Sequence, residues 1–127
     1  NQVGSIGYVN QSYIKGEVVA AALQNKSGEF IKPSLESGAL ALNGISLDEN
    51  LAGTDPNPTA EGAYPIATLT WILAFETGNG NKTEAIKETF RRALSDEYQE
   101  KSSVVGFVPL RGDILEKSRA AVERISK

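Results

Sequence analysis

The stretch IATLTWILAF, residues Ile66–Phe75, decides the fold. Every residue in it is apolar or threonine, and the turn residues Gly78-Asn79-Gly80 follow it closely. Continuous apolar runs bounded by turn residues are typical of strands that are covered on both faces. The stretch therefore predicts a buried strand, with Trp71 in the core.

Beyond this strand, the sequence predicts helices. Asn81–Glu84 has the form of a capping box and predicts the start of a helix, and Asp113–Glu116 predicts the start of a last helix in the same way. Ser95–Ser103 predicts a short helix between them, and Val104–Leu110 is expected to be extended.

Before the central strand, the first residues predict strands and one short helix. Ser5–Val9 is a short apolar run that predicts a buried strand, and Asn10–Gly16 predicts a turn or two of helix. Val18–Gln24 and Glu29–Lys32 predict the two strands of a hairpin, because Asn25–Gly28 between them has turn-forming residues.

A helix and a long loop complete this half of the chain. Ser34 is a favourable N-cap, and Asn43-Gly44 is expected to end the helix with Gly44 in the left-handed conformation. Residues 45–62 contain Gly53–Thr59, which is too rich in turn residues for regular structure. These patterns together predict an α/β fold.

The composition excludes several classes of function. The chain has 127 residues, no Cys and no His, which removes thiolate nucleophiles, imidazole bases and nearly all zinc sites. The net charge of −3 and the lack of a basic patch argue against a nucleic-acid partner. The sequence also has no Met, so we expect it to be a piece of a longer chain.

The remaining candidates for chemistry are carboxylates in and before the long loop. They are Glu36, Asp48, Glu49, Asp55 and Glu61. A pair of them could perform glycosidase-type hydrolysis, but a solvated acidic loop is the simpler explanation.

Two helix starts are weak candidates for anion binding. Gly78–Asn81 places glycines between a predicted strand and a helix, and Ser34 and Ser37 lie beside Lys32 at another helix start. A turn and a capped helix explain the first, and in the second we expect the Ser34 hydroxyl to be occupied by its own helix.

Three segments resemble the phosphate-specific substrate-binding proteins of ABC transporters, and they occur in the same order. Gly4–Val9 is similar to their Gly-x-Ile-Gly-Tyr-Val strand, and Glu61–Leu73 to their aromatic-Pro-Ile strand with its Thr-aromatic-Ile-Leu tail. Val105–Leu110 is similar to the turn before their final helix. The resemblance covers essentially the whole chain.

The resemblance implies the C-terminal portion of a class II periplasmic-binding-protein fold that contributes to both lobes. Residues 1–63 would end the second lobe, and residues 64–127 would complete the first. The hinge would be Ala63, Tyr64, Pro65 and Ile66, where proline fixes its own φ and favours an extended residue before it.

The family's phosphate ligands lie in motifs that do not occur here, so no phosphate-binding residue is assigned, nor any catalytic residue, metal or cofactor. The implied function is phosphate uptake through an ABC permease, without enzyme activity. The implied location is periplasmic or extracytoplasmic, with a signal peptide expected upstream. An interaction module that binds a protein partner is the alternative. Because half-lobes leave strands unpaired, we also expect a complementary fragment, a swapped dimer or a compact subdomain.

Overall fold

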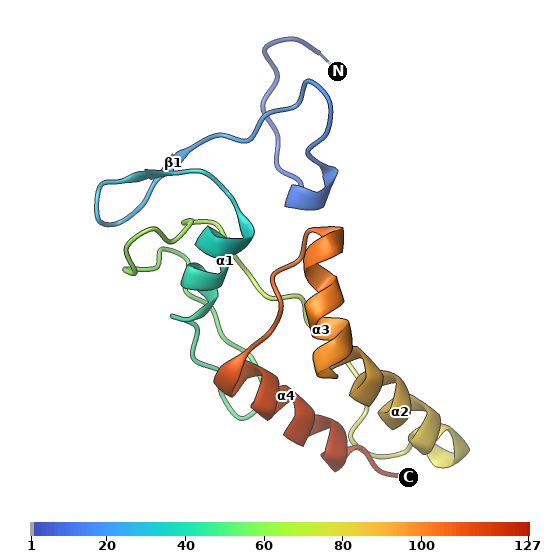
Figure 1. Cartoon of the computed structure of the whole chain (residues 1–127). Helices are drawn as coiled ribbons and strands as arrows, with labels where there is room; N and C mark the ends of the chain where they lie inside the picture. Colours follow the sequence, from blue (N-terminus) through green and yellow to red (C-terminus); the bar gives the residue numbers. More distant parts are fainter. Residues whose placement is uncertain (1) are drawn as a thin grey trace.

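A computed structural model describes residues 2–127, which form a mixed α/β arrangement (Figure 1). Its helices and strands are β1 (Leu23–Gln24), β2 (Phe30–Ile31), α1 (Leu35–Leu42), α2 (Thr83–Ala93), α3 (Asp96–Ser102) and α4 (Gly112–Arg124). Short 3-10 turns are formed by Gln11–Tyr13, Gly80–Lys82 and Ser103–Val105.

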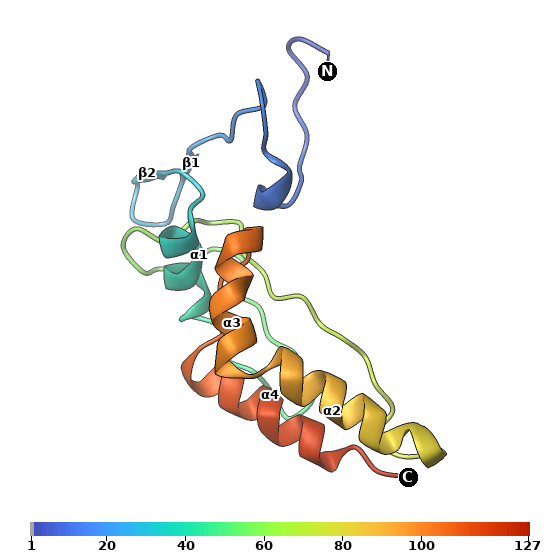
Figure 2. The ribbon, with the colours of Figure 1, turned by 45° about the vertical axis from the view of Figure 1, so that its right-hand side comes forward.

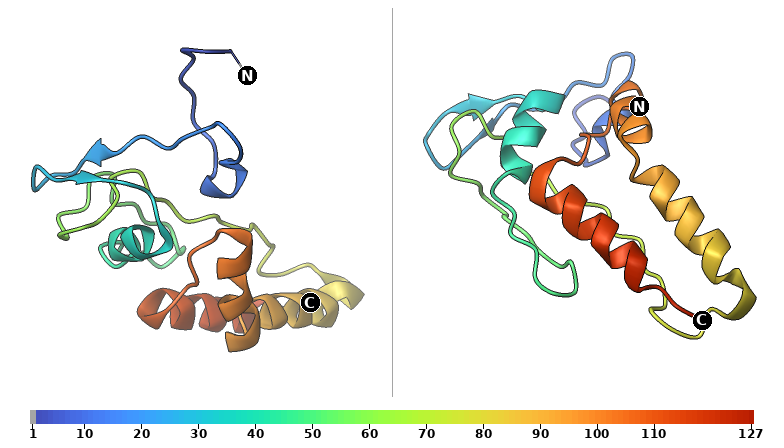
Figure 3. Two further views of the ribbon diagram at one scale, coloured as in Figure 1. Left: turned by 45° about the horizontal axis from the view of Figure 1, so that its top comes forward. Right: turned by 60° about the horizontal axis from the view of Figure 1, so that its bottom comes forward.

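The helices gather at one end of the molecule. α2 and α4 run side by side in opposite directions, and α3 continues from α2 toward α1 (Figure 2). The β1–β2 hairpin lies next to α1, and the N-terminal residues extend away as an arm (Figure 3). Within residues 2–127, no helix has both the length and the apolar composition needed to cross a membrane.

The hydrophobic core is small and joins the two halves of the chain. Leu42 and Ile45, at the end of α1 and just after it, pack against Leu69. The partly buried residues that surround them are Leu47, Val108, Leu110 and Ile114. Both sides of the predicted hinge therefore contribute to one cluster.

The predicted hairpin and the helix after it are confirmed. β1 pairs antiparallel with β2, with Leu23 opposite Ile31. Ser34 is the N-cap of α1, and its hydroxyl accepts a hydrogen bond of 3.0 Å from the Ser37 amide. The prediction of a left-handed Gly44 is wrong, because Gly44 has no positive φ. α1 ends at Leu42, and its C-cap Asn43 is right-handed and donates its amide to the Ala39 carbonyl.

The prediction of a buried central strand is wrong for this chain. Residues 66–75 are extended but belong to no strand, and no main-chain hydrogen bond within residues 2–127 joins them to another main-chain group. Leu69 is buried, whereas Trp71 is 44% exposed and Leu73 95% exposed. A strand needs a neighbour, and the described residues supply none here.

The other N-terminal predictions hold only in part or are wrong. Ser5–Val9 forms no strand and is exposed on all sides. The helix expected over Asn10–Gly16 is reduced to the 3-10 turn Gln11–Tyr13, and only the last two residues of Val18–Gln24 pair as a strand.

The later helices are confirmed, but their predicted capping boxes are wrong. α2 begins after a 3-10 turn with Lys82 as a cap that makes no side-chain hydrogen bond, and Arg111 precedes α4 in the same way. In α3, by contrast, Ser95 caps the helix with its hydroxyl. The segment after α3 is first a 3-10 turn and only then extended.

The C-terminal residues are fixed beside the end of the extended segment. The Ser126 amide donates to the Glu76 carbonyl at 2.7 Å. The Asn79 side chain donates to the carbonyls of Phe75 and Ser126, at 2.8 and 3.0 Å. The side-chain amide of Asn79 therefore joins two segments that are far apart in the sequence.

Candidate functional site

The corner at the start of the predicted hinge contains Ala63, a fully buried residue of the described part of the chain. Ala63 is 0% exposed, and the Pro58 side chain, earlier in the same loop, is fully buried. The Ala63 amide donates to the Ala60 carbonyl at 3.1 Å, which closes a turn. Gly62 has a φ of +73°, a conformation that glycine adopts without steric cost.

Side chains of the hairpin and backbone of α1 hold this corner. The Gly62 amide donates to Glu29 Oε2 at 3.2 Å, and the Tyr64 amide donates to the Ser37 carbonyl at 3.0 Å. Glu29 also accepts from the buried Asn25 side chain at 3.0 Å. The hydrogen bond from Asn25, followed by that from Gly62, lowers the pKa of Glu29.

The remaining hinge residues are less constrained. Pro65 is half-buried and Ile66 is 73% exposed, and neither joins a main-chain hydrogen bond in the described part of the chain. The four predicted hinge residues therefore divide into a fixed pair and a pair without such bonds.

The acidic candidates do not form a site. Within residues 2–127, no three Asp or Glu side chains lie close enough together to hold a metal ion. Asp48 is used locally, since its Oδ1 accepts from the amides of Asn50 and Ala52 at 2.9 and 2.8 Å. The hydrolase hypothesis needs only a pair of carboxylates, and it stays a prediction.

At both candidate anion sites, polar side chains already form hydrogen bonds within the chain. Ser34 and Ser37 bond to each other at 3.0 Å, as expected for a capped helix start. At Gly78–Asn81, the Thr83 hydroxyl donates to the Gly80 carbonyl and the Asn79 side chain donates to main-chain carbonyls. No phosphate-binding residue is assigned from either place.

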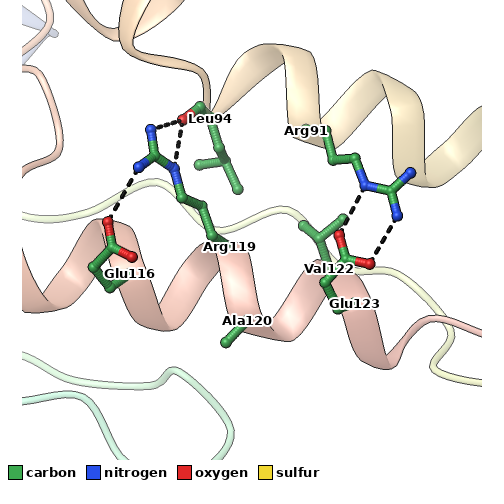
Figure 4. Close-up of a pocket in the computed structure, with 7 residues that line it drawn as sticks. All are labelled: Arg91, Leu94, Glu116, Arg119, Ala120, Val122 and Glu123. Carbon is green, nitrogen blue, oxygen red and sulfur yellow. Dashed lines mark hydrogen bonds and ion pairs between the residues drawn. The ribbon is translucent and has the colours of Figure 1, made fainter.

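A shallow cleft of about 440 Å³ lies between α2 and α4 and is lined by charges that neutralise one another (Figure 4). Arg91 pairs with Glu123 through hydrogen bonds of 2.8 and 2.7 Å, and Lys87 lies 3.3 Å from the same carboxylate. The hydrogen bond from Arg91 lowers the pKa of Glu123 to about 2.

The second arginine of this cleft is engaged in the same way. Arg119 donates to the Leu94 carbonyl, to Asp96 at 2.7 Å and to Glu116 at 3.1 Å. Because both guanidinium groups already face carboxylates, the cleft stabilises the helix pair rather than offering an anion site. No motif in the sequence marked these residues.

A groove of about 420 Å³ runs along the extended segment, between that segment and the helices. Apolar residues from Leu69 to Ala74, together with residues of α2 and α4, line it. Among the lining residues, Ile72 and Leu73 are largely exposed. The Trp71 indole donates to the Leu51 carbonyl at 2.7 Å, which fixes one point of the segment.

No family model matches the chain. It is similar to curated proteins named phosphate-binding protein PstS. It is 28% identical to that of Methanocaldococcus jannaschii over 97% of the chain, and 32% identical to that of Xylella fastidiosa over 92%. It is also 32% identical to that of Haemophilus influenzae over 87%. The chain spans about a third of the length of these relatives, at 35%, 33% and 34%.

Proposed function

The chain is a relative of the phosphate-binding proteins named PstS across about a third of their length, and on this premise we propose that it is part of a protein that binds inorganic phosphate. That protein delivers phosphate to an ABC permease in the membrane and acts in the periplasm. It binds its ligand and performs no catalysis.

In this proposal the chain supplies scaffold and hinge. It belongs to a class II periplasmic-binding-protein fold, with residues 1–63 in one lobe, residues 64–127 in the other, and Ala63–Ile66 between them. The observation that carries the proposal is the match of most of the chain to five relatives with the same name.

The geometry supports a role in a larger assembly. The unpaired segment 66–75 and the exposed N-terminal arm carry apolar side chains that other strands would cover. Phosphate recognition requires several convergent donors, and in the described residues Arg91 and Arg119 already face carboxylates. The phosphate ligands are therefore assigned to the rest of the longer protein.

A chimera tests this function. The part of the Xylella fastidiosa relative that aligns with this chain is replaced by residues 1–127, and inorganic phosphate is titrated into it by calorimetry. We expect the chimera to bind phosphate and the 127-residue chain alone to give no binding heat.

The unaltered Xylella fastidiosa protein is the positive control, and sulfate is the control for non-specific anion binding. Circular dichroism first establishes that each protein is folded. A folded chimera that does not bind phosphate would reject the proposed function. Tight binding by the 127-residue chain alone would reject the assignment of the ligands to the rest of the protein.

A further inference from the structure

Glu29 is 33 residues from Gly62 in the sequence, yet its side chain reaches the corner that precedes the predicted hinge. A single oxygen, Oε2, accepts from the Gly62 amide at 3.2 Å, from Asn25 at 3.0 Å and from the Ser27 hydroxyl at 3.3 Å. Within residues 2–127, its other oxygen accepts no hydrogen bond from a side chain or an amide.

The hairpin turn holds this carboxylate in place. Asn25 is 5% exposed, and its Oδ1 accepts from the Glu29 amide at 2.9 Å. The same Oδ1 lies 3.0 Å from the Ser27 hydroxyl, whose single proton it shares with Glu29 Oε2. The Asn25 amide closes the turn by donating to the Glu29 carbonyl at 2.8 Å. Hydrogen bonds within the hairpin therefore hold both the backbone and the side chain of Glu29, independently of its contact with Gly62.

Hydrogen bonds hold the backbone up to Tyr64, and within residues 2–127 none hold the main chain in the residues just after it. Gly62 is held by Glu29, Ala63 is fully buried, and Tyr64 is held by the Ser37 carbonyl. From residue 65 to residue 68, no main-chain hydrogen bond holds the described chain, and Leu69 is the next residue to enter the core.

We propose that Glu29 is a positioning residue for the hinge: with the Ser37 carbonyl it fixes Gly62–Tyr64, so that rotation between the lobes begins at Pro65. This inference rests on the proposed function for its lobes. It narrows the hinge from Ala63–Ile66 to the residues after Tyr64, and it requires the Leu69 contact with Leu42 and Ile45 to shift when the lobes move.

The test is hydrogen exchange of individual backbone amides, followed by NMR in the 127-residue chain. In the wild-type chain we expect the amides of Gly62 and Tyr64 to be protected and those of Ile66–Thr68 to exchange freely. Glu29→Ala removes the acceptor and should speed exchange at Gly62 by about tenfold, with Tyr64 following and α2 and α4 unchanged.

Two variants separate positioning from general stability. Glu29→Gln keeps an oxygen acceptor where Oε2 stands, so it should restore the protection of Gly62. Glu36→Ala removes an exposed carboxylate from the first turn of α1 and should leave Gly62 as in the wild type.

Three results would overturn the proposal: a Gly62 amide that stays protected in Glu29→Ala, a Glu29→Gln chain that exchanges as fast as Glu29→Ala, or an increase spread over all helices. None of these readouts involves phosphate. A failed chimera would therefore reject the proposed function without changing the exchange result. An exchange result that rejects the role of Glu29 would likewise leave the proposed function unchanged.

Discussion

At the scale of single residues, Glu123 of α4 joins this helix to α2 through two cationic side chains. It accepts hydrogen bonds from Arg91, and it pairs with Lys87, so two elements far apart in the sequence share one carboxylate. The pairs lie at the surface, where solvent weakens them. The contribution of these ion pairs to stability is therefore best measured by following the protonation of Glu123.

Acidification should weaken this contact in a defined window. The Glu123 pKa is lowered from 4.5 to about 2, chiefly by the hydrogen bond from Arg91. A lowered folded-state pKa adds stability that is complete above 4.5 and is lost as the pH falls from 4.5 toward 2. Titration of the carboxyl carbon by NMR should show the low pKa directly.

Urea unfolding at a series of pH values gives the second readout. Glu123→Gln should flatten the loss of stability between pH 4.5 and pH 2 relative to the wild type. Glu88→Gln is the matched control, because Glu88 is exposed on α2 and forms no ion pair within residues 2–127. A Glu123 carboxyl that titrates like an ordinary glutamate would contradict the prediction.

At the scale of elements, the start of α1 is fixed by the reciprocal bonds of Ser34 and Ser37. Ser34→Ala should reduce the free energy of unfolding by about 1 kcal/mol, since it leaves an amide of the first turn without its acceptor. Urea unfolding followed by circular dichroism measures this difference. Ser46→Ala, at an exposed position after the helix, should change little, and equal effects of the two variants would argue against the capping role.

Local chemistry explains which elements the sequence could predict. The Asn25–Gly28 turn and the Ser34 cap act on neighbouring residues, so their patterns were sufficient. Ile66–Phe75 has the composition of a strand, but a strand also needs a partner, and composition cannot supply one.

Contacts between distant residues account for what the sequence could not predict of the site. Pro65 and Tyr64 were named from a resemblance, and their role as a hinge stays a prediction. Glu29 gave no signal in the sequence, because its contact with Gly62 depends on how the hairpin packs against the loop. Arg91 and Glu123 likewise meet only after α2 and α4 have packed.

At the scale of the whole molecule, much apolar surface remains uncovered. Ile72 is 71% exposed, Leu73 95% and Phe75 81%, and they share one extended segment. Exposed apolar segments with unpaired backbone tend to associate edge to edge. We therefore expect the 127-residue chain alone to self-associate as its concentration rises, which sedimentation velocity would show.

A pair of double variants locates the surface responsible. Ile72→Lys with Leu73→Lys should reduce the association and leave the helical circular dichroism unchanged. Val104→Lys with Val105→Lys alters two exposed apolar neighbours on the turn after α3 and should leave the association as it was. A chain that stays monomeric throughout, or equal effects of the two pairs, would contradict the prediction.

The bonds between Ser126, Glu76 and Asn79 have a practical consequence for spectroscopy. A fluorophore attached at Lys127 would sit beside the far end of the extended segment, although residue 76 is 50 positions away from Ser126. Energy transfer from the single tryptophan, Trp71, to that fluorophore would then report the distance from the middle of the segment to its end. Such a pair would report when neighbouring strands straighten or displace the segment, without any label on the surface that they cover.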